Sequence, residues 1–181
     1  MKKSNHKCRN AQDADLKQAI LIGLDECLIS LEESFQNIND DHIQAFPIPG
    51  ENNIAWIVMH CLDNLDDCAI GAQSGERLYP SEWRWDLWEC SPNERPKPGD
   101  PFPTPPEMLE RLWAIREKSM SILDAFNEQI LTAPYNIHPL KSNRADLYMR
   151  TICHTNSHIR QIWYLKGALG IKTASPQQHW A

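Results

Sequence analysis

The chain alternates between long stretches in which apolar residues recur every three or four positions and shorter stretches rich in proline and polar residues. The first periodic stretch runs from Leu16 to Ile38. Its spacing places the apolar side chains on one face of a helix, and it predicts an amphipathic helix capped by Asp13 or Asp15. The next segment, 39–52, contains two prolines and a glycine and is predicted to be a loop.

A second helix is predicted from the apolar positions between Ile54 and Ala72, with Asn52 or Asn53 as its N-cap and Gly75 at its end. Asparagine suits the N-cap because its side-chain oxygen accepts a hydrogen bond from a free N–H group of the first turn. Glycine suits the end because it adopts the left-handed conformation at little cost.

Two further helices have clear start signals. Thr104 is followed by proline at the first helical position and by Glu107, and the apolar periodicity then continues to Ile130. The prolines of segment 134–139 end this helix. The last helix starts at Asn143, which has an aspartate three positions later, and ends at Gly170.

No segment shows the strict alternation of a strand, so the predicted fold is all-α, a four-helix bundle. The length of 181 residues suits a single domain over 1–181, with residues 1–12 expected to be flexible. A long Trp/Pro-rich connection, Tyr79–Pro103, joins the second and third helices. We expect its tryptophans to pack against the bundle or a second subunit.

Composition narrows the functional class. The chain is 41% hydrophobic and 23% charged, and its net charge is −6. An acidic chain lacks the excess positive charge that is typical of nucleic-acid-binding proteins. No apolar run is long enough to span a membrane. The N-terminus has basic residues without the apolar core of a signal peptide, so a cytoplasmic location is expected, with the six cysteines reduced.

Candidate chemistry centres on two histidines. His154 and His158 are four residues apart in the last helix, so both imidazoles lie on one helical face. Their line continues through apolar positions, which predicts that they face the core. Neutral imidazole is a good ligand for Zn, Ni, Cu or Fe(II), and the alternative is a pair of hydrogen-bonded core histidines. Neither a zincin motif nor the Glu-x-x-His pairs of di-iron bundles are present.

A third histidine, His60, lies in the predicted second helix, on the same stripe as Trp56. Three histidines from two packed helices would form a facial set that leaves positions for water or substrate, as in catalytic zinc sites. By itself His60 is more often structural. Cys61 and Cys153 each adjoin a histidine, but neighbouring helical residues point about 100° apart. Both cysteines are therefore predicted to be small buried apolar residues and not ligands.

Four polar residues follow these histidines by one or two helical turns and are candidates to orient them: Asp63, Asn64, Asp67 and Gln161. Each taken separately is more often a solvated or core-edge residue. No general base emerges from the sequence.

The sequence resembles the DinB/DfsB superfamily of four-helix bundles at two places. The stretch from Asn53 through Trp56 to His60 is similar to the family's signature in its second helix. The stretch from His154 through His158 to Gln161-Ile162 is similar to its His-x-x-x-His-x-x-Gln-Ile signature in the fourth. The resemblance implies a divalent metal held by His60, His154 and His158, with Zn or Ni favoured over Fe or Mn.

The resemblance also implies a choice of functions. Some members are thiol-dependent transferases or isomerases that use bacillithiol, mycothiol or glutathione, and metal-assisted hydrolysis of a small molecule is a related expectation. In a thiol-dependent member the metal would lower the pKa of the thiol. The alternative is a non-catalytic, metal-stabilised dimeric module. The expected partners are a small-molecule substrate or thiol and a second copy of the chain, with no nucleic acid and no membrane.

Overall fold

The computed structural model describes residues 15–36, 38–78, 96–135 and 143–172. Within these ranges the secondary structure is helical, apart from an isolated bridge between Pro134 and Asn143, and no strand is formed. The prediction of an all-α fold is confirmed. The helices are α1 (Leu16–Phe35), α2 (Asp40–Gln44), α3 (Ile54–Leu65), the π-helix η1 (Asp66–Gly71), α4 (Ala72–Ser74), α5 (Pro105–Ala125), α6 (Glu128–Thr132) and α7 (Arg144–Ala168).

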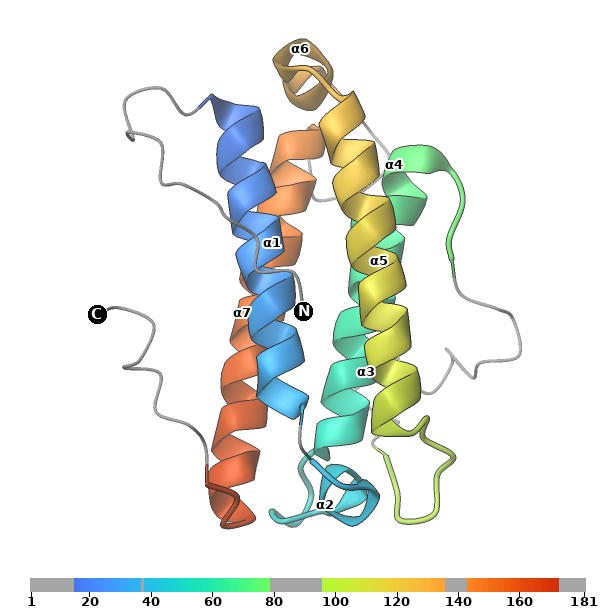
Figure 1. Cartoon of the computed structure of the whole chain (residues 1–181), viewed down its shortest axis with the longest axis vertical. Coiled ribbons are helices and arrows are strands. Elements are labelled where there is room, and N and C mark those ends of the chain that lie inside the picture. The colour runs from blue at the N-terminus through green and yellow to red at the C-terminus, as the bar shows by residue number, and fades with distance from the viewer. Residues whose placement is uncertain (1–14, 37, 79–95, 136–142, 173–181) are drawn as a thin grey trace.

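Four long helical segments lie side by side along the long axis of the molecule. Figure 1 shows α1, α3, α5 and α7 in this arrangement, with α2 at one end and α6 at the other. The π-helix η1 and α4 continue directly from α3. The apolar stripes that the sequence predicts meet in one core, whose largest fully buried side chains include Phe35, Leu24, Met59, Leu62 and Tyr148.

The starts of the long helices lie where the sequence predicts them. Asp15 accepts a hydrogen bond from the N–H group of Gln18 at 2.7 Å, so Asp15 and not Asp13 caps α1. The Glu107 carboxylate accepts hydrogen bonds from the backbone N–H group and the hydroxyl of Thr104, each at 2.7 Å, and completes a capping box at α5. These bonds satisfy N–H groups that a helix start otherwise leaves free.

Two predicted helices end earlier than the apolar periodicity suggests. The first ends at Phe35, and part of the predicted loop 39–52 forms α2, capped by Asn39. The third predicted helix, which is α5, ends at Ala125, and Asn127 then caps α6. In both cases an asparagine side chain accepts a bond from the N–H group three residues later at 2.8 Å, and this starts a new helix in place of continuing the old one.

The π-helix η1 is a feature that periodicity does not predict. Its Asp66 is fully buried, and its carboxylate accepts hydrogen bonds from the Leu78 N–H group at 2.8 Å and from Arg77 Nε at 3.3 Å. These contacts fold the chain after α4 back against η1. Gly71 leaves room for this return, because a Cβ there would lie 2.8 Å from Arg77 Cγ.

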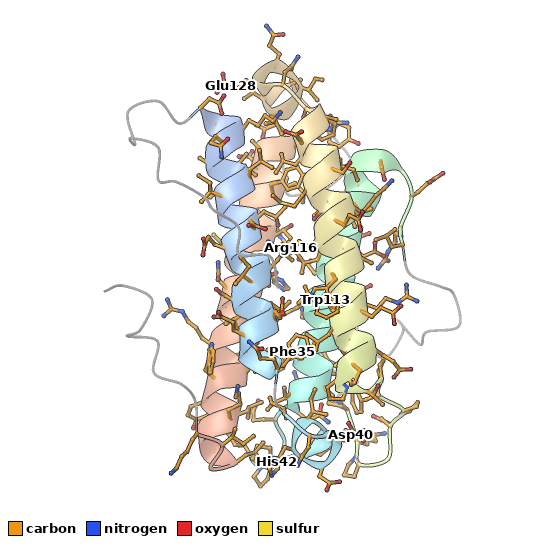
Figure 2. The ribbon with its side chains drawn as sticks, in the orientation of Figure 1. Phe35, Asp40, His42, Trp113, Arg116 and Glu128 are labelled. Atoms are coloured by element: carbon orange, nitrogen blue, oxygen red, sulfur yellow. The ribbon has the colours of Figure 1, made fainter. Side chains whose placement is uncertain are left out.

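Two cations, one partly buried and one buried, hold α1 against its neighbours. Arg116 of α5 points toward α1 (Figure 2), where its Nε lies 2.7 Å from an oxygen of the buried Asp25. Lys166 of α7 is itself buried and donates from Nζ to the backbone oxygen of Ser34 at 2.9 Å. That carbonyl belongs to the last turn of α1, where helix carbonyls lack partners within the helix.

Part of the sequence-based expectation falls outside the described residues. The tryptophans at 83, 85 and 88 lie in segment 79–95, and the N-terminal segment 1–12 lies within 1–14, so the expectations for both segments stay predictions. In the part of the chain that the structure describes, no helix combines the length and the apolar character needed to cross a membrane.

Asn53 is expected to contribute more to the free energy of unfolding than an exposed N-cap residue does. It is fully buried, accepts a hydrogen bond from the Trp56 N–H group at 2.9 Å and donates one to the Gln44 oxygen at 3.1 Å. Asn53→Ala should lower the free energy of unfolding by about 1–2 kcal/mol, measured by urea denaturation. Asn39→Ala, at the exposed cap of the short α2, is the matched control, and an equal loss in both variants would contradict the special role of Asn53.

Candidate metal centre

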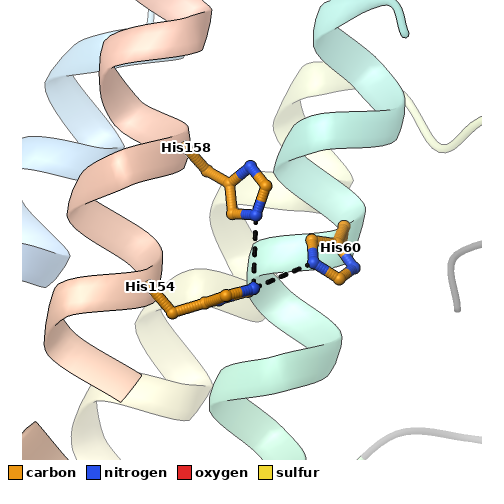
Figure 3. Close-up of side chains that lie close together, drawn as sticks. All are labelled: His60, His154 and His158. Carbon is orange, nitrogen blue, oxygen red and sulfur yellow. Dashed lines mark hydrogen bonds between the residues drawn. The ribbon is translucent and has the colours of Figure 1, made fainter. Parts of the chain in front are cut away.

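Three histidines meet between α3 and α7. His60 projects from α3, and His154 and His158 project from α7 one turn apart, with their Nε2 atoms converging (Figure 3). The Nε2 of His154 lies 3.1 Å from that of His60 and 3.2 Å from that of His158. His60 is 6% exposed and the other two are half-buried, so the cluster lies at the edge of the core. The predicted convergence of all three is thus observed.

The spacing of the nitrogens fits a shared metal ion. Two nitrogens that each lie about 2.05 Å from one metal are about 2.9 Å apart at a right angle and about 3.3 Å apart at the tetrahedral angle. The observed 3.1 and 3.2 Å lie between these values. All three candidate ligand atoms lie within 4.8 Å of one another. The histidines would therefore need little movement to hold a metal on one side and leave its other side open.

Hydrogen bonding alone accounts poorly for this cluster. Each imidazole nitrogen carries either one N–H group or one lone pair, so His154 Nε2 can make one good hydrogen bond and not two. His154 Nδ1 is also buried and has no partner in the described structure. A cation that accepts the lone pairs of all three nitrogens would remove the conflict at Nε2.

Gln161 sets the orientation of His158. Its Oε1 lies 2.8 Å from His158 Nδ1. Because an amide oxygen only accepts, Nδ1 must carry the proton, and the lone pair of His158 is then on Nε2, which faces the other histidines. Gln161 therefore contacts a histidine of the centre directly, and such contacts raise metal affinity.

The other three candidates have different contacts. Asp63 and Asp67 form ion pairs with Arg77, and Asn64 donates toward Cys68 Sγ at 3.7 Å. These side chains belong to the contacts that hold the chain around η1. Asp63 and Asn64 lie within about one helical turn of His60, whereas Asp67 lies about two turns away. The sequence alone does not show that Arg77 forms ion pairs with the two aspartates.

His60 is positioned by the residues that precede it in α3. Asn53 caps the helix, and the Trp56 indole stacks on the His60 ring at a centroid distance of 5.0 Å and an interplanar angle of 9°. Residues four apart in a helix lie on the same face, which allows this stacking. The capping and the stacking together fix the helix start and the ring plane, and they direct His60 toward α7.

The prediction that the neighbouring cysteines are buried is confirmed for Cys61 and wrong for Cys153. Cys61 is buried, but Cys153 is exposed. On α7 the buried stripe runs through Ile152 and Thr155, and the 100° step between neighbours turns Cys153 to the opposite, open side. Met149 lies one turn before it on the same exposed side.

The environment of the cluster keeps His154 and His158 neutral. Burial, followed by the nearby His158, His60 and Arg150, lowers the pKa of His154 to about 3. Burial also lowers the pKa of His158, partly opposed by the Gln161 hydrogen bond. Neutral imidazole is the form that coordinates metal, so these two ligands need not release a proton near neutral pH.

These shifts predict an acid-sensitive metal-free protein. Between the usual histidine pKa of 6.5 and about 3, the unfolded chain binds a proton at His154 that the folded chain excludes. The free energy of unfolding should therefore fall as the pH is lowered through this window, by at most about 1.4 kcal/mol per pH unit for that proton. Urea denaturation of the metal-free protein and of His154→Asn should show the smaller acid loss in the variant, and equal losses would contradict the assignment.

The comparisons with known proteins agree with this geometry. A family model described as the DinB superfamily matches residues 24–162, which include all three histidines. The chain belongs to the DinB superfamily. The resemblance drawn from the Asn53–His60 and His154–Ile162 stretches is confirmed.

One solved structure shares the fold of this chain over most of its length. The crystal structure of the conserved protein of locus from Enterococcus faecalis superposes with a TM-score of 0.64 and covers 88% of this chain and 99% of that one. Its sequence is 19% identical, so the likeness concerns the fold alone. No curated protein matches the sequence.

Proposed function

We propose that this DinB protein is a metal-dependent enzyme that activates a small thiol for transfer, at a Zn or Ni ion held by His60, His154 and His158 within a four-helix bundle. The observation that carries the proposal is the convergence of three imidazole Nε2 atoms, with no fourth candidate ligand in the cluster among the described residues. Three protein ligands leave positions for an exogenous ligand, which is the pattern of catalytic zinc sites.

Access from solvent favours an enzyme over a structural module. His154 borders an open pocket of about 510 Å³ on the outer side of α7. A structural metal is normally enclosed by four protein ligands, whereas a site beside an open pocket admits small molecules. The same feature argues against a purely dimer-stabilising metal.

Each residue of such a site would have a separate role. His60, His154 and His158 would hold the ion, Gln161 keeps His158 in the coordinating tautomer, and Trp56 fixes the plane of His60. When bound, a divalent cation supplies the positive charge that lowers the pKa of a thiol toward neutrality. Bacillithiol, mycothiol and glutathione are the candidate thiols from the family resemblance.

Thiol transfer is preferred to hydrolysis because of the nearby carboxylates. Hydrolysis generally uses a general base that takes a proton from water. Asp63, Asp66 and Asp67 are the carboxylates closest in sequence to His60, and all three form ion pairs with Arg77 that favour their role in the fold around η1. Thiol activation needs no protein base once the thiol pKa is low.

Thiol binding to Co²⁺-loaded protein tests this function. Adding 2-mercaptoethanol near neutral pH should produce a sulfur-to-cobalt charge-transfer band in the near ultraviolet, and ethylene glycol should not. His60→Ala should abolish the response. A Co²⁺ spectrum that no thiol changes would indicate a closed site and favour the non-catalytic module.

A further inference from the structure

The outer side of α7 carries a pocket that is bordered by His154 and extends toward the start of the helix. Its volume is about 510 Å³ and it is open to solvent. It is lined by Asp146, Met149, Arg150, Cys153, His154 and Ser157. A molecule that reaches the centre from this pocket must therefore pass the side chains of α7 next to His154.

Arg150 is the unusual member of this lining. Its side chain is partly buried, and its Nη1 is shielded from solvent with no hydrogen-bond partner in the described part of the chain. Arg116 and Arg77 have anionic partners, Asp25 and Asp66, and the guanidinium of Arg144 lies over the rings of Phe126 and Tyr135. Shielding a guanidinium nitrogen without a partner is unfavourable, so the position of Arg150 is costly for folding and fits a site that binds an anion.

The geometry links Arg150 to the metal centre. Arg150 and His154 are four residues apart on α7, so their side chains share a helical face about 6 Å apart along the axis. Both line the same pocket. The guanidinium offers a planar fork of N–H donors that matches a carboxylate or another compact oxyanion. Asp146, at the other end of the pocket, is exposed, and solvent screens its charge.

We propose that Arg150 forms an acid-binding subsite beside the metal centre, which selects small substrates that carry a carboxylate or a similarly compact oxyanion. This inference rests on the proposed function, because it identifies the chemical class of the molecule that the centre receives. The thiol sulfur would occupy the centre and the acid group would pair with Arg150.

Two thiols of matched size test the subsite. The Zn²⁺-loaded protein is titrated with 3-mercaptopropionate and with 3-mercaptopropan-1-ol, and dissociation constants are measured from amide and arginine side-chain NMR shifts. A charge-assisted contact predicts that the acid binds about tenfold more tightly than the alcohol. Arg150→Gln should remove that preference and leave the affinity for the alcohol unchanged, and Arg150→Lys should retain part of it.

Arg160→Gln is the matched control, because it removes the same charge from an exposed position of α7 outside the pocket. It should leave the preference intact. Equal affinities for the two thiols in the parent protein, or a preference that survives Arg150→Gln, would overturn the subsite while thiol binding stands.

Propionate separates failure of the subsite from failure of the thiol proposal. If neither thiol binds, the proposed function has failed, and propionate decides the subsite by itself. Propionate binding that depends on Arg150 would support the subsite, and the absence of such binding would overturn it.

Discussion

Replacing any one of His60, His154 and His158 by alanine is expected to lower the affinity for Zn²⁺ or Ni²⁺ by more than about 100-fold, because loss of a direct ligand costs more than the 10–100-fold effect of losing a group that orients one. The three nitrogens are arranged around one point, with His154 Nε2 at 3.1 and 3.2 Å from the other two. Each variant retains two ligands. Calorimetric titration should therefore give three losses of similar size.

His42→Ala is the matched control for this series. His42 is exposed and lies in α2 at one end of the molecule (Figure 2). Its removal should leave metal affinity unchanged. Circular dichroism of each metal-free variant separates loss of ligation from loss of fold. Full affinity in His60→Ala would remove α3 from the site and leave only the pair on α7.

Metal binding should also stabilise the fold, because the ligands come from helices far apart in the sequence. At a free metal concentration about a thousand times the dissociation constant, binding to the folded state alone contributes about 4 kcal/mol. For a domain of this size, that corresponds to a rise of about 10 °C in the midpoint of thermal unfolding. Thermal denaturation with and without Zn²⁺ measures the shift, and a chelator should reverse it.

Two controls show whether the shift comes from the histidines. His60→Ala should show little stabilisation by Zn²⁺, and Mg²⁺ should have little effect on the parent protein because it prefers oxygen ligands. Cys153→Ser should respond like the parent protein, since the exposed thiol is not a proposed ligand. A zinc shift that survives in His60→Ala and disappears in Cys153→Ser would place the metal at the thiol.

Local signals predict the starts of the long helices and much of the site. Thr104 with Glu107, and Asn143 at the start of α7, act within a single turn, so the sequence alone reveals them. The spacing of His154 and His158 likewise places both on one face of α7 by helical geometry. His60 is different, because its distance from them depends on how α3 packs against α7, and the family resemblance supplied that information.

Features that depend on contacts between distant residues were not predictable in this way. The π-helix η1 accompanies the bonds of buried Asp66 with Leu78 and Arg77, which lie beyond the helix. The end of α1 coincides with the contact between Ser34 and Lys166, 132 positions later. The exposure of Cys153 follows from which face of α7 meets α1 and α3, and periodicity near a polar site leaves that choice open.

X-ray absorption spectroscopy of the Zn²⁺- or Ni²⁺-loaded protein tests the His60–His154–His158 centre most directly. For zinc, the predicted spectrum has a first shell of nitrogen and oxygen at about 2.0–2.1 Å, with the outer-shell scattering of three imidazoles. The same measurement on His60→Ala should lose one imidazole. A zinc spectrum with sulfur at about 2.3 Å, or with fewer than three imidazoles in the parent protein, would contradict the three-histidine centre.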